Sequence, residues 1–237
     1  MNGYTFERRE LKYRITDAQR AALEAAFGAR MVPDEHGEST ICNIYYDTAD
    51  HRLIRASLEK PAYKEKLRLR SYGIPGDGSM VFPEIKKKAQ GIVYKRRVSM
   101  PYAQAISFLA GKSSAPEGQI YRELRWMLAS YPHLTPKVFL SYERDSWQGI
   151  EQSALRLTLD REIHYRTERL DLQHDTSGDD ILQPGQTLME VKIPGAAPLW
   201  LSHALSALWI FPTSFSKYGE AYQRICKENE METKQYA

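Results

Sequence analysis

The feature that most constrains the fold is a segment in which cations alternate with apolar residues. In KEKLRLRSY, residues 64–72, Lys or Arg occupies positions 64, 66, 68 and 70, and leucine occupies positions 67 and 69. Side chains of a β-strand point alternately to its two faces, so the segment predicts a strand with one cationic and one apolar face. Neighbouring cations on such a face lie about 6.6 Å apart and repel each other by about 2.5 kcal/mol at an effective dielectric constant of 20. We expect the cationic face to be solvated or to meet an anion.

The same alternation recurs along the chain and predicts a sheet of about eight strands. Besides residues 64–72, strands are expected at 6–15, 39–46, 79–89, 92–100, 136–147, 154–166 and 187–195. The pattern is weakest at 136–147, where Tyr142 and Arg144 share parity with Val138 and Leu140. Helices are expected at 17–28, 101–111, 117–131, 198–210 and 217–230, with fraying beyond Glu228. Asp17 is the preferred N-cap of the first helix, and Thr16 is the alternative.

Composition favours one soluble domain. The chain of 237 residues, 42% of them hydrophobic, can bury a substantial core, and no Pro- or Ser-rich linker divides it. We therefore expect a single α+β domain over residues 1–237. The net charge of +3 does not by itself indicate nucleic-acid binding. The apolar segment 198–211 is too short to span a bilayer, and the first residues lack the apolar stretch of a signal peptide, so a cytoplasmic protein is expected.

Acidic residues share the charged faces in a repeated pattern. The dyad Glu-x-Lys occurs at residues 10–12, 84–86 and 190–192. An acid and a base two positions apart on a strand can pair with each other and still leave donors for an anion. A solvated face of an antiparallel sheet would also explain such charges. If the sheet closes into a barrel, the charged faces line a basic tube suited to a linear polyanion, and the carboxylates can hold a divalent metal.

Nine motifs in chain order resemble the VTC-type polyphosphate polymerase domain, a CYTH-like member of the triphosphate tunnel metalloenzyme superfamily. They are ELKYRI, STICNIYYDT, KLRLRSYG, PEIKKK, YKRR, SYERDSW, LRLTLD, MEVKIP and SFSKYGEAY, spread over about residues 5–225. The resemblance implies a closed tunnel of eight antiparallel strands with helices packed outside. It also implies a metal-dependent phosphotransferase that adds the γ-phosphoryl group of a nucleoside triphosphate, expected to be ATP, to a growing polyphosphate chain, with Mn²⁺ or Mg²⁺ as cofactor.

The resemblance also implies individual site residues. The catalytic tunnel cations would be Lys12, Arg68, Arg70, Lys86, Lys95, Arg144, Arg156 and Lys217. Further substrate contacts would come from Tyr142, Ser216, Arg97 and Lys192. Glu190 is the expected metal ligand and Glu10 the second candidate, although Arg8 replaces the first glutamate of the superfamily's ExExK signature, which argues against the CYTH branch. Lys64 and Lys66 lie outside the matched positions and are assigned to the tunnel mouth or to solvent.

Three other functions stay open at this point. A triphosphatase on the same fold would pass the γ-phosphoryl group to water, and a non-catalytic module would only bind polyphosphate. Nucleic-acid binding ranks below these, because no aromatic residues are interleaved with the Lys and Arg runs as stacking platforms. The expected partners are a nucleoside triphosphate and polyphosphate, without nucleic acid or a membrane span. A membrane-protein partner and the oligomeric state are left open.

Overall fold

Strands and helices alternate irregularly along the chain, in an α+β arrangement as predicted. The computed structural model describes residues 8–59, 61–90, 92–113, 117–131 and 133–235. The strands are β1 (Arg8–Thr16), β2 (Met31–Asp47), β3 (Tyr63–Tyr72), β4 (Met80–Ala89), β5 (Ile92–Arg97), β6 (Met100–Pro101), β7 (Thr135–Gly149), β8 (Arg156–Arg166), β9 (Asp179–Asp180) and β10 (Gln186–Pro194). The helices are α1 (Asp17–Phe27), α2 (Arg52–Leu58), α3 (Tyr102–Leu109), α4 (Gln119–Ser130), α5 (Leu199–Ala207) and α6 (Lys217–Gln235), with a short 3-10 helix η1 (Gly28–Arg30).

The strands follow one hydrogen-bonded path, β1-β10-β8-β7-β2-β3-β4-β5, with β6 beside β4 and β9 beside β8. The pairs with a defined register are antiparallel, including β1 with β10 and β3 with β4. The path of the described strands has two ends, β1 and β5, so the closed eight-stranded tunnel that the resemblance implies is not confirmed. No helix in the described part of the chain is both long enough and apolar enough to cross a membrane.

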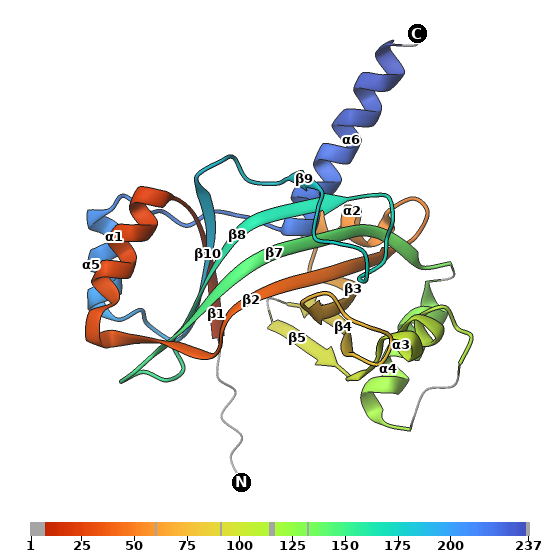
Figure 1. Ribbon diagram of the computed structural model, residues 1–237, viewed down its shortest axis with the longest axis horizontal. Helices are drawn as coiled ribbons and strands as arrows, with labels where there is room; N and C mark the ends of the chain where they lie inside the picture. The colour runs from red at the N-terminus through yellow and green to blue at the C-terminus, as the bar shows by residue number, and fades with distance from the viewer. Residues whose placement is uncertain (1–7, 60, 91, 114–116, 132, 236–237) are drawn as a thin grey trace. The chain divides into compact units, whose positions relative to one another are not determined.

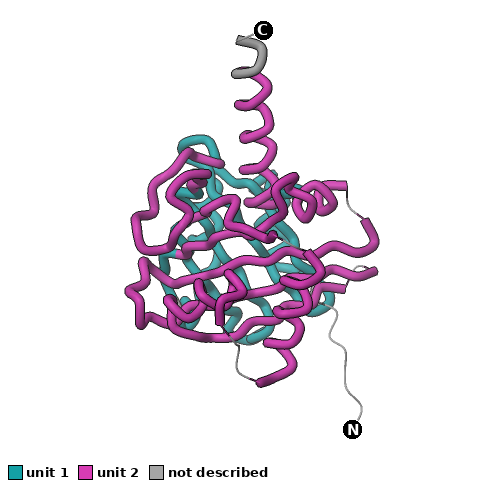
Figure 2. The backbone as a smooth tube through the Cα atoms, turned by 90° about the vertical axis from the view of Figure 1, so that its right-hand side faces the viewer, with its two compact units in different colours: residues 1–40, 142–163, 182–215 teal, residues 41–141, 164–181, 216–237 magenta. Residues whose placement is uncertain are grey.

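The chain divides into two compact units, each assembled from three separate segments (Figure 2). Unit 1 comprises residues 1–40, 142–163 and 182–215. Unit 2 comprises residues 41–141, 164–181 and 216–237. Strands β2, β7 and β8 each run from one unit into the other. The single domain over residues 1–237 stays a prediction.

The core of unit 1 lies on the apolar faces of β8 and β10. Buried side chains from these strands and from both helices of the unit form one cluster, which includes Leu157, Leu159, Met189, Val191, Leu23 and Leu201. Helices α1 and α5 lie side by side (Figure 1). Helix α1 begins with a capping box, in which the Thr16 hydroxyl accepts a hydrogen bond from the backbone N of Gln19 while the Gln19 side chain accepts one from the backbone N of Thr16. The alternative N-cap, Thr16, is therefore correct and the preferred Asp17 is wrong.

The core of unit 2 confirms the predicted apolar face of β3. Leu67 and Leu69 are fully buried and belong to one cluster with Ile85 of β4 and with residues of α3 and α4. Helices α3 and α4 lie on the β4 side of this unit (Figure 1). The leucines of KEKLRLRSY thus hold the strand in place by burial, and the cations of the same strand are left on its other face.

Helix α2 was missed by the sequence analysis, and its start explains why. The residue before it, His51, has a left-handed backbone conformation and makes no side-chain cap. The cap comes instead from Asp47, whose carboxylate accepts hydrogen bonds from the backbone N of Leu53 at 2.8 Å and of Ile54 at 3.0 Å. An acceptor this far upstream is not a local capping signal. Helix α6 also continues past Glu228 to Gln235.

Asp47 should be a main determinant of the stability of unit 2. It is fully buried, and besides capping α2 it accepts a hydrogen bond from the Tyr218 hydroxyl of α6 at 2.9 Å. Asp47→Asn replaces one accepting oxygen by a donor, so we expect the free energy of unfolding to fall by about 3 kcal/mol. Tyr218→Phe, which removes a single bond to this carboxylate, should lower it by about 1 to 1.5 kcal/mol. Urea unfolding followed by circular dichroism tests both, and an unchanged midpoint for Asp47→Asn would contradict the assignment.

Candidate functional site

The predicted site residues fall into two groups, one in each compact unit. Unit 2 contains Arg68, Arg70, Lys86, Lys95, Arg97, Ser216 and Lys217. Unit 1 contains Glu10, Lys12, Tyr142, Arg144, Arg156, Glu190 and Lys192. The two groups differ in chemistry, because acidic residues are more prominent in the second.

Cations from three strands share one face of the sheet in unit 2. Lys66 of β3 lies opposite Lys86 of β4, which lies opposite Lys95 of β5. Directly opposite residues of neighbouring strands point to the same face of the sheet, so the charged faces of the three strands form one continuous surface. We call this surface the basic face, and it comprises Lys66, Arg68, Arg70, Glu84, Lys86, Lys95 and Arg97.

Glu84 is a buried acid within the basic face. Its side chain is 1% exposed, Arg68 Nε donates to Oε2 at 2.7 Å, and Lys95 Nζ lies 2.9 Å from Oε1. Burial alone would raise the pKa of Glu84, but Arg68, Arg70 and Lys95 outweigh it and lower the pKa to about 2. Glu84 therefore stays ionised and holds two of the predicted phosphate-binding cations. The sequence pattern places Glu84 only in a dyad with Lys86, because its partners on the neighbouring strands depend on the strand register.

Strand β2 supplies polar partners that the sequence analysis missed. Arg68 Nη1 donates to the Tyr45 hydroxyl at 3.2 Å, and Arg70 Nε donates to Asn43 Oδ1 at 2.9 Å. Burial raises the pKa of the Tyr45 phenol, but Arg68 and the other cations of β3 more than offset this and lower it to about 8. The Tyr45 ring stacks on Tyr218 of α6 at 4.6 Å between centroids. In the sequence, the only indication of these partners was that Asn43 and Tyr45 lie two residues apart in the predicted strand 39–46 and therefore share one of its faces.

The start of α6 lies against the basic face. Lys66 Nζ donates to Ser216 Oγ at 3.0 Å, and this oxygen also accepts from the backbone N of Gly219 at 3.2 Å. Ser216 therefore caps α6, and Lys217 is the first residue of the helix. Lys66, assigned to the tunnel mouth or to solvent, is half-buried, and its ammonium contacts a predicted substrate-binding residue. Lys64, also assigned there, is half-buried and donates to the Ser57 carbonyl at 3.0 Å.

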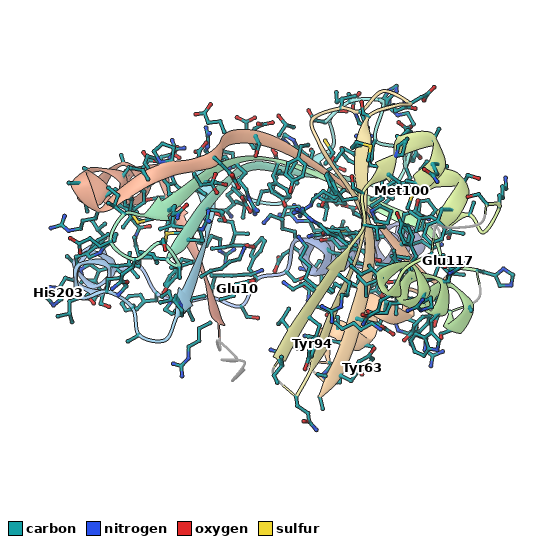
Figure 3. The ribbon with its side chains drawn as sticks, turned by 90° about the horizontal axis from the view of Figure 1, so that it is seen from below. Glu10, Tyr63, Tyr94, Met100, Glu117 and His203 are labelled. Atoms are coloured by element: carbon teal, nitrogen blue, oxygen red, sulfur yellow. The ribbon has the colours of Figure 1, made fainter. Side chains whose placement is uncertain are left out.

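In unit 1 the two candidate metal ligands share a lysine. Lys12 lies opposite Glu190 in the pairing of β1 with β10. Its Nζ is 3.2 Å from Glu190 Oε1 and 3.6 Å from Glu10 Oε1, and it donates to the Phe215 carbonyl at 3.1 Å. Glu190 is 9% exposed, whereas Glu10, labelled in Figure 3, is exposed at the edge of the described chain. Three predicted site residues are thus brought together.

Arg144 is fixed by an acid that the sequence analysis did not select. Its Nε and Nη2 form a two-pronged contact with the fully buried carboxylate of Asp160, at 2.6 and 2.7 Å. Burial alone would lower the pKa of Arg144, but Asp160 reverses the effect and raises it. Nη2 lies 3.9 Å from Glu190 Oε2, and the guanidinium stands over the Tyr142 ring at 5.1 Å. Tyr142, Arg144 and Glu190 therefore form one contact group despite the weak pattern of β7.

The remaining predicted residues of unit 1 continue this charged surface. Arg156 lies opposite Lys192, which in turn lies opposite Glu10. Arg156 Nη1 is 3.4 Å from Asp34 Oδ2. Asp34 was missed because β2 begins at Met31, eight residues before the predicted strand.

The residues around Glu190 fit a metal only if phosphate completes its coordination. Among the residues that the structure describes, no three His, Cys, Asp or Glu side chains gather into a metal-binding group. Mg²⁺ commonly keeps several waters and binds through one or two carboxylates together with substrate phosphates. Glu190 and Glu10, which both lie close to Lys12 Nζ, provide such carboxylates. The donor set therefore fits a metal carried in with a phosphate substrate and does not fit a preformed metal cage.

Comparison with one solved structure supports the fold. A protein from Hippeastrum, HpAC1, described as a candidate adenylyl cyclase with a dominant triphosphatase activity, is similar at 16% sequence identity, with 88% of this chain and 92% of that chain covered and a TM-score of 0.51. A candidate adenylate cyclase from Vibrio parahaemolyticus is 11% identical, with 91% and 97% covered and a TM-score of 0.47. None of the curated proteins compared with the chain matches its sequence.

The sequence itself identifies the family. The family model of the VTC domain matches residues 7–226, nearly the whole chain. The matched range includes both groups of charged residues, from Glu10 in β1 to Lys217 in α6. The chain therefore belongs to the VTC domain family.

Proposed function

We propose that the protein is a metal-dependent polyphosphate polymerase, which transfers the γ-phosphoryl group of a nucleoside triphosphate, expected to be ATP, to a polyphosphate chain within a closed eight-stranded tunnel. The observation that carries this proposal is the basic face, where cations of three strands surround the buried carboxylate of Glu84. Membership of the VTC domain family supports the same activity.

Buried partners distinguish the basic face from an ordinary solvated surface. Arg68 is held by Glu84, which is 1% exposed, and Arg70 by Asn43, which is also 1% exposed. Surface cations in water gain little from a fixed geometry and lose side-chain entropy to keep it. A guanidinium group has five donors in a planar fork that matches phosphate oxygens. Fixed arginines next to a row of lysines therefore suit a ligand with repeating phosphate groups.

The reaction requires positioning and charge neutralisation more than a protein nucleophile. A terminal oxygen of the polyphosphate chain attacks the γ-phosphorus, the bond from this phosphorus to the β,γ-bridging oxygen breaks, and the nucleoside diphosphate leaves. The attacking oxygen is already anionic, so no strong general base is needed. The cations of the basic face hold the phosphates and offset their charge. Glu190, with Glu10 as second candidate, would hold a Mn²⁺ or Mg²⁺ ion, which would supply positive charge to offset the negative charge of a phosphate substrate.

A triphosphatase is the second candidate function. The fold is similar to that of HpAC1, for which a dominant triphosphatase activity is described. This is a fold-level analogy, since folds host many activities. The two functions differ in the acceptor, which is the end of a phosphate chain in one case and water in the other.

The products of ATP turnover distinguish the two functions. We expect the purified protein, incubated with ATP and Mn²⁺, to form ADP and long-chain polyphosphate. One phosphoryl group should enter the polymer for each ADP released. The measurement follows ADP, free phosphate and polymer separately over time. Free phosphate without polymer would replace the proposal by the triphosphatase, and tight polyphosphate binding without any product would replace it by a binding module.

Glu190→Gln should separate turnover from anion binding. The change removes the proposed metal ligand but also a negative charge beside Lys12 and Arg144. We expect turnover to fall by roughly two orders of magnitude or more, while the affinity for inorganic tripolyphosphate stays the same or rises. Mn²⁺ binding in the presence of tripolyphosphate, followed by electron paramagnetic resonance, should weaken in parallel with turnover.

The control for this substitution is Glu151→Gln, because Glu151 is exposed in the loop between β7 and β8 of the same unit. It should leave turnover, Mn²⁺ binding and tripolyphosphate binding unchanged. Wild-type turnover and Mn²⁺ affinity in Glu190→Gln would remove Glu190 from the metal site.

Lys95 should make anion binding dependent on pH. The Lys95 side chain is 43% exposed, and its partial burial lowers its pKa to about 8, while Glu84 opposes the effect and Arg68 and Arg70 add to it. The protonated lysine binds an anion better, so affinity should fall as the pH rises through 8, and a bound anion should raise the pKa and take up a proton. Lys95→Arg stays charged throughout, so between pH 7 and 9 its affinity should fall less than that of the wild type, by up to roughly tenfold.

The measurement is calorimetric titration with inorganic tripolyphosphate at several pH values. Comparing the two proteins at each pH cancels the ionisation of the ligand and of Tyr45, which both share. Parallel pH curves for wild type and Lys95→Arg would contradict the role of Lys95.

A further inference from the structure

An aromatic pair extends the basic face at one end. Phe82 of β4 lies opposite Arg70 of β3, so it shares the face of the cations. Tyr72 follows Arg70 by two residues, and its ring lies 5.6 Å from that of Phe82 at an interplanar angle of 80°. The sequence runs of Lys and Arg contain no interleaved aromatic residues, but the strand register adds two aromatic rings at this end of the face. One ring comes from the neighbouring strand, where only the register brings it to the arginines.

Arg97 joins the same group from β5. Its guanidinium carbon lies 4.9 Å from the centroid of the Phe82 ring, and its Nη1 donates to the Tyr72 hydroxyl at 3.5 Å. Tyr72 is 45% exposed and Arg97 is also exposed. We call Tyr72, Phe82 and Arg97 the aromatic platform. Phosphate binding can account for Arg97 and for the Tyr72 hydroxyl but not for the ring of Phe82, which has no group that can donate a hydrogen bond to a phosphate oxygen.

We propose that the aromatic platform binds the nucleobase of the nucleoside triphosphate, with the phosphates extending over Arg70 and Arg68. The inference rests on the proposed function and adds a subsite to it. Nucleobases stack on aromatic rings and on guanidinium planes, and every base offers such a face, so stacking by itself favours no particular base. The platform therefore distinguishes a nucleotide from an inorganic triphosphate.

The spacing along β3 agrees with such a ligand. Residues on one face of a strand follow each other at about 6.6 Å, so Tyr72 and Arg68 are roughly 13 Å apart. An extended nucleoside triphosphate covers this distance from its base to its γ-phosphate. The γ-phosphate then lies toward Arg68 and the lysines that follow, Lys66 of β3 and Lys86 of β4. The acceptor chain accordingly approaches from the lysine end of the basic face, and the base is held at the aromatic end.

Tyr72→Ala tests the platform, and Tyr94→Ala is the matched control. Tyr94, labelled in Figure 3, is similarly exposed at 43% but lies on the other face of the sheet, opposite Lys87. Affinities for ATP and for inorganic tripolyphosphate are measured by calorimetry without divalent metal, so that no turnover occurs. We expect Tyr72→Ala to weaken ATP binding by about fivefold or more and to leave tripolyphosphate binding within about twofold. Tyr94→Ala should change neither, and Tyr72→Trp, which keeps a stacking surface, should retain ATP binding.

Each outcome bears on the inference separately from the proposed function. Equal losses for both ligands would assign Tyr72 a structural role and overturn the nucleobase subsite, as would unchanged ATP binding. If Tyr72→Ala selectively loses ATP binding but the wild-type protein forms no polymer from ATP, the nucleobase subsite stands and the polymerase does not. If the wild type binds neither ATP nor tripolyphosphate, both are overturned.

Discussion

The basic face depends on the ion pairs that the buried, ionised carboxylate of Glu84 makes with Arg68 and Lys95. An unpaired charge at 1% exposure would be destabilising by several kcal/mol, so Arg68 and Lys95 are held beside it whether or not a ligand is present. The same carboxylate offsets the repulsion between these cations and their neighbours. One acid thus makes a dense group of cations stable enough to fold and leaves the group with an excess of positive charge. The geometry for an anion is set in the folded chain and need not be organised by the substrate.

Unit 1 uses the same device with a different balance of charge. Asp160 fixes Arg144 as Glu84 fixes Arg68, and in both cases the acidic residue is at most 1% exposed. Glu190 adds a second acid beside Arg144, and Lys12 reaches it from β1. The charge in unit 1 is therefore closer to neutral, and such a surface favours a phosphate that arrives with a divalent cation. The basic face of unit 2 favours the bare anion. In the proposed reaction, binding of the phosphate chain and binding of the metal are thus supported by chemically different surfaces.

The sequence predicted the faces of the strands well and their neighbours poorly. The alternation in β3 correctly placed Leu67 and Leu69 in a core, because a strand has a side-chain period of two whatever its surroundings. The partners of Arg68 and Arg144 lie 16 residues away in each case, and their identity depends on turn geometry and register, which no local pattern encodes. Helix α2 was missed for a related reason, since its cap is the carboxylate of Asp47 and not the residue before the helix. Family resemblance supplied the cations, but the buried acids that hold them became visible only in the structure.

The order of residues along β3 relates the basic face to the two kinds of ligand in the proposed reaction. On the charged side of the strand the sequence runs lysine, lysine, arginine, arginine, tyrosine from position 64 to position 72. Arginine binds phosphate through a directional fork, whereas lysine is a compact charge that tolerates many phosphate orientations. A nucleotide has to be held in one orientation for in-line attack, and a polymer has to move by one phosphate after every transfer. Directional groups next to the aromatic ring and non-directional groups at the other end meet these two requirements on a single strand. The cations of KEKLRLRSY therefore repeat at every second position and also change from lysine to arginine along the strand.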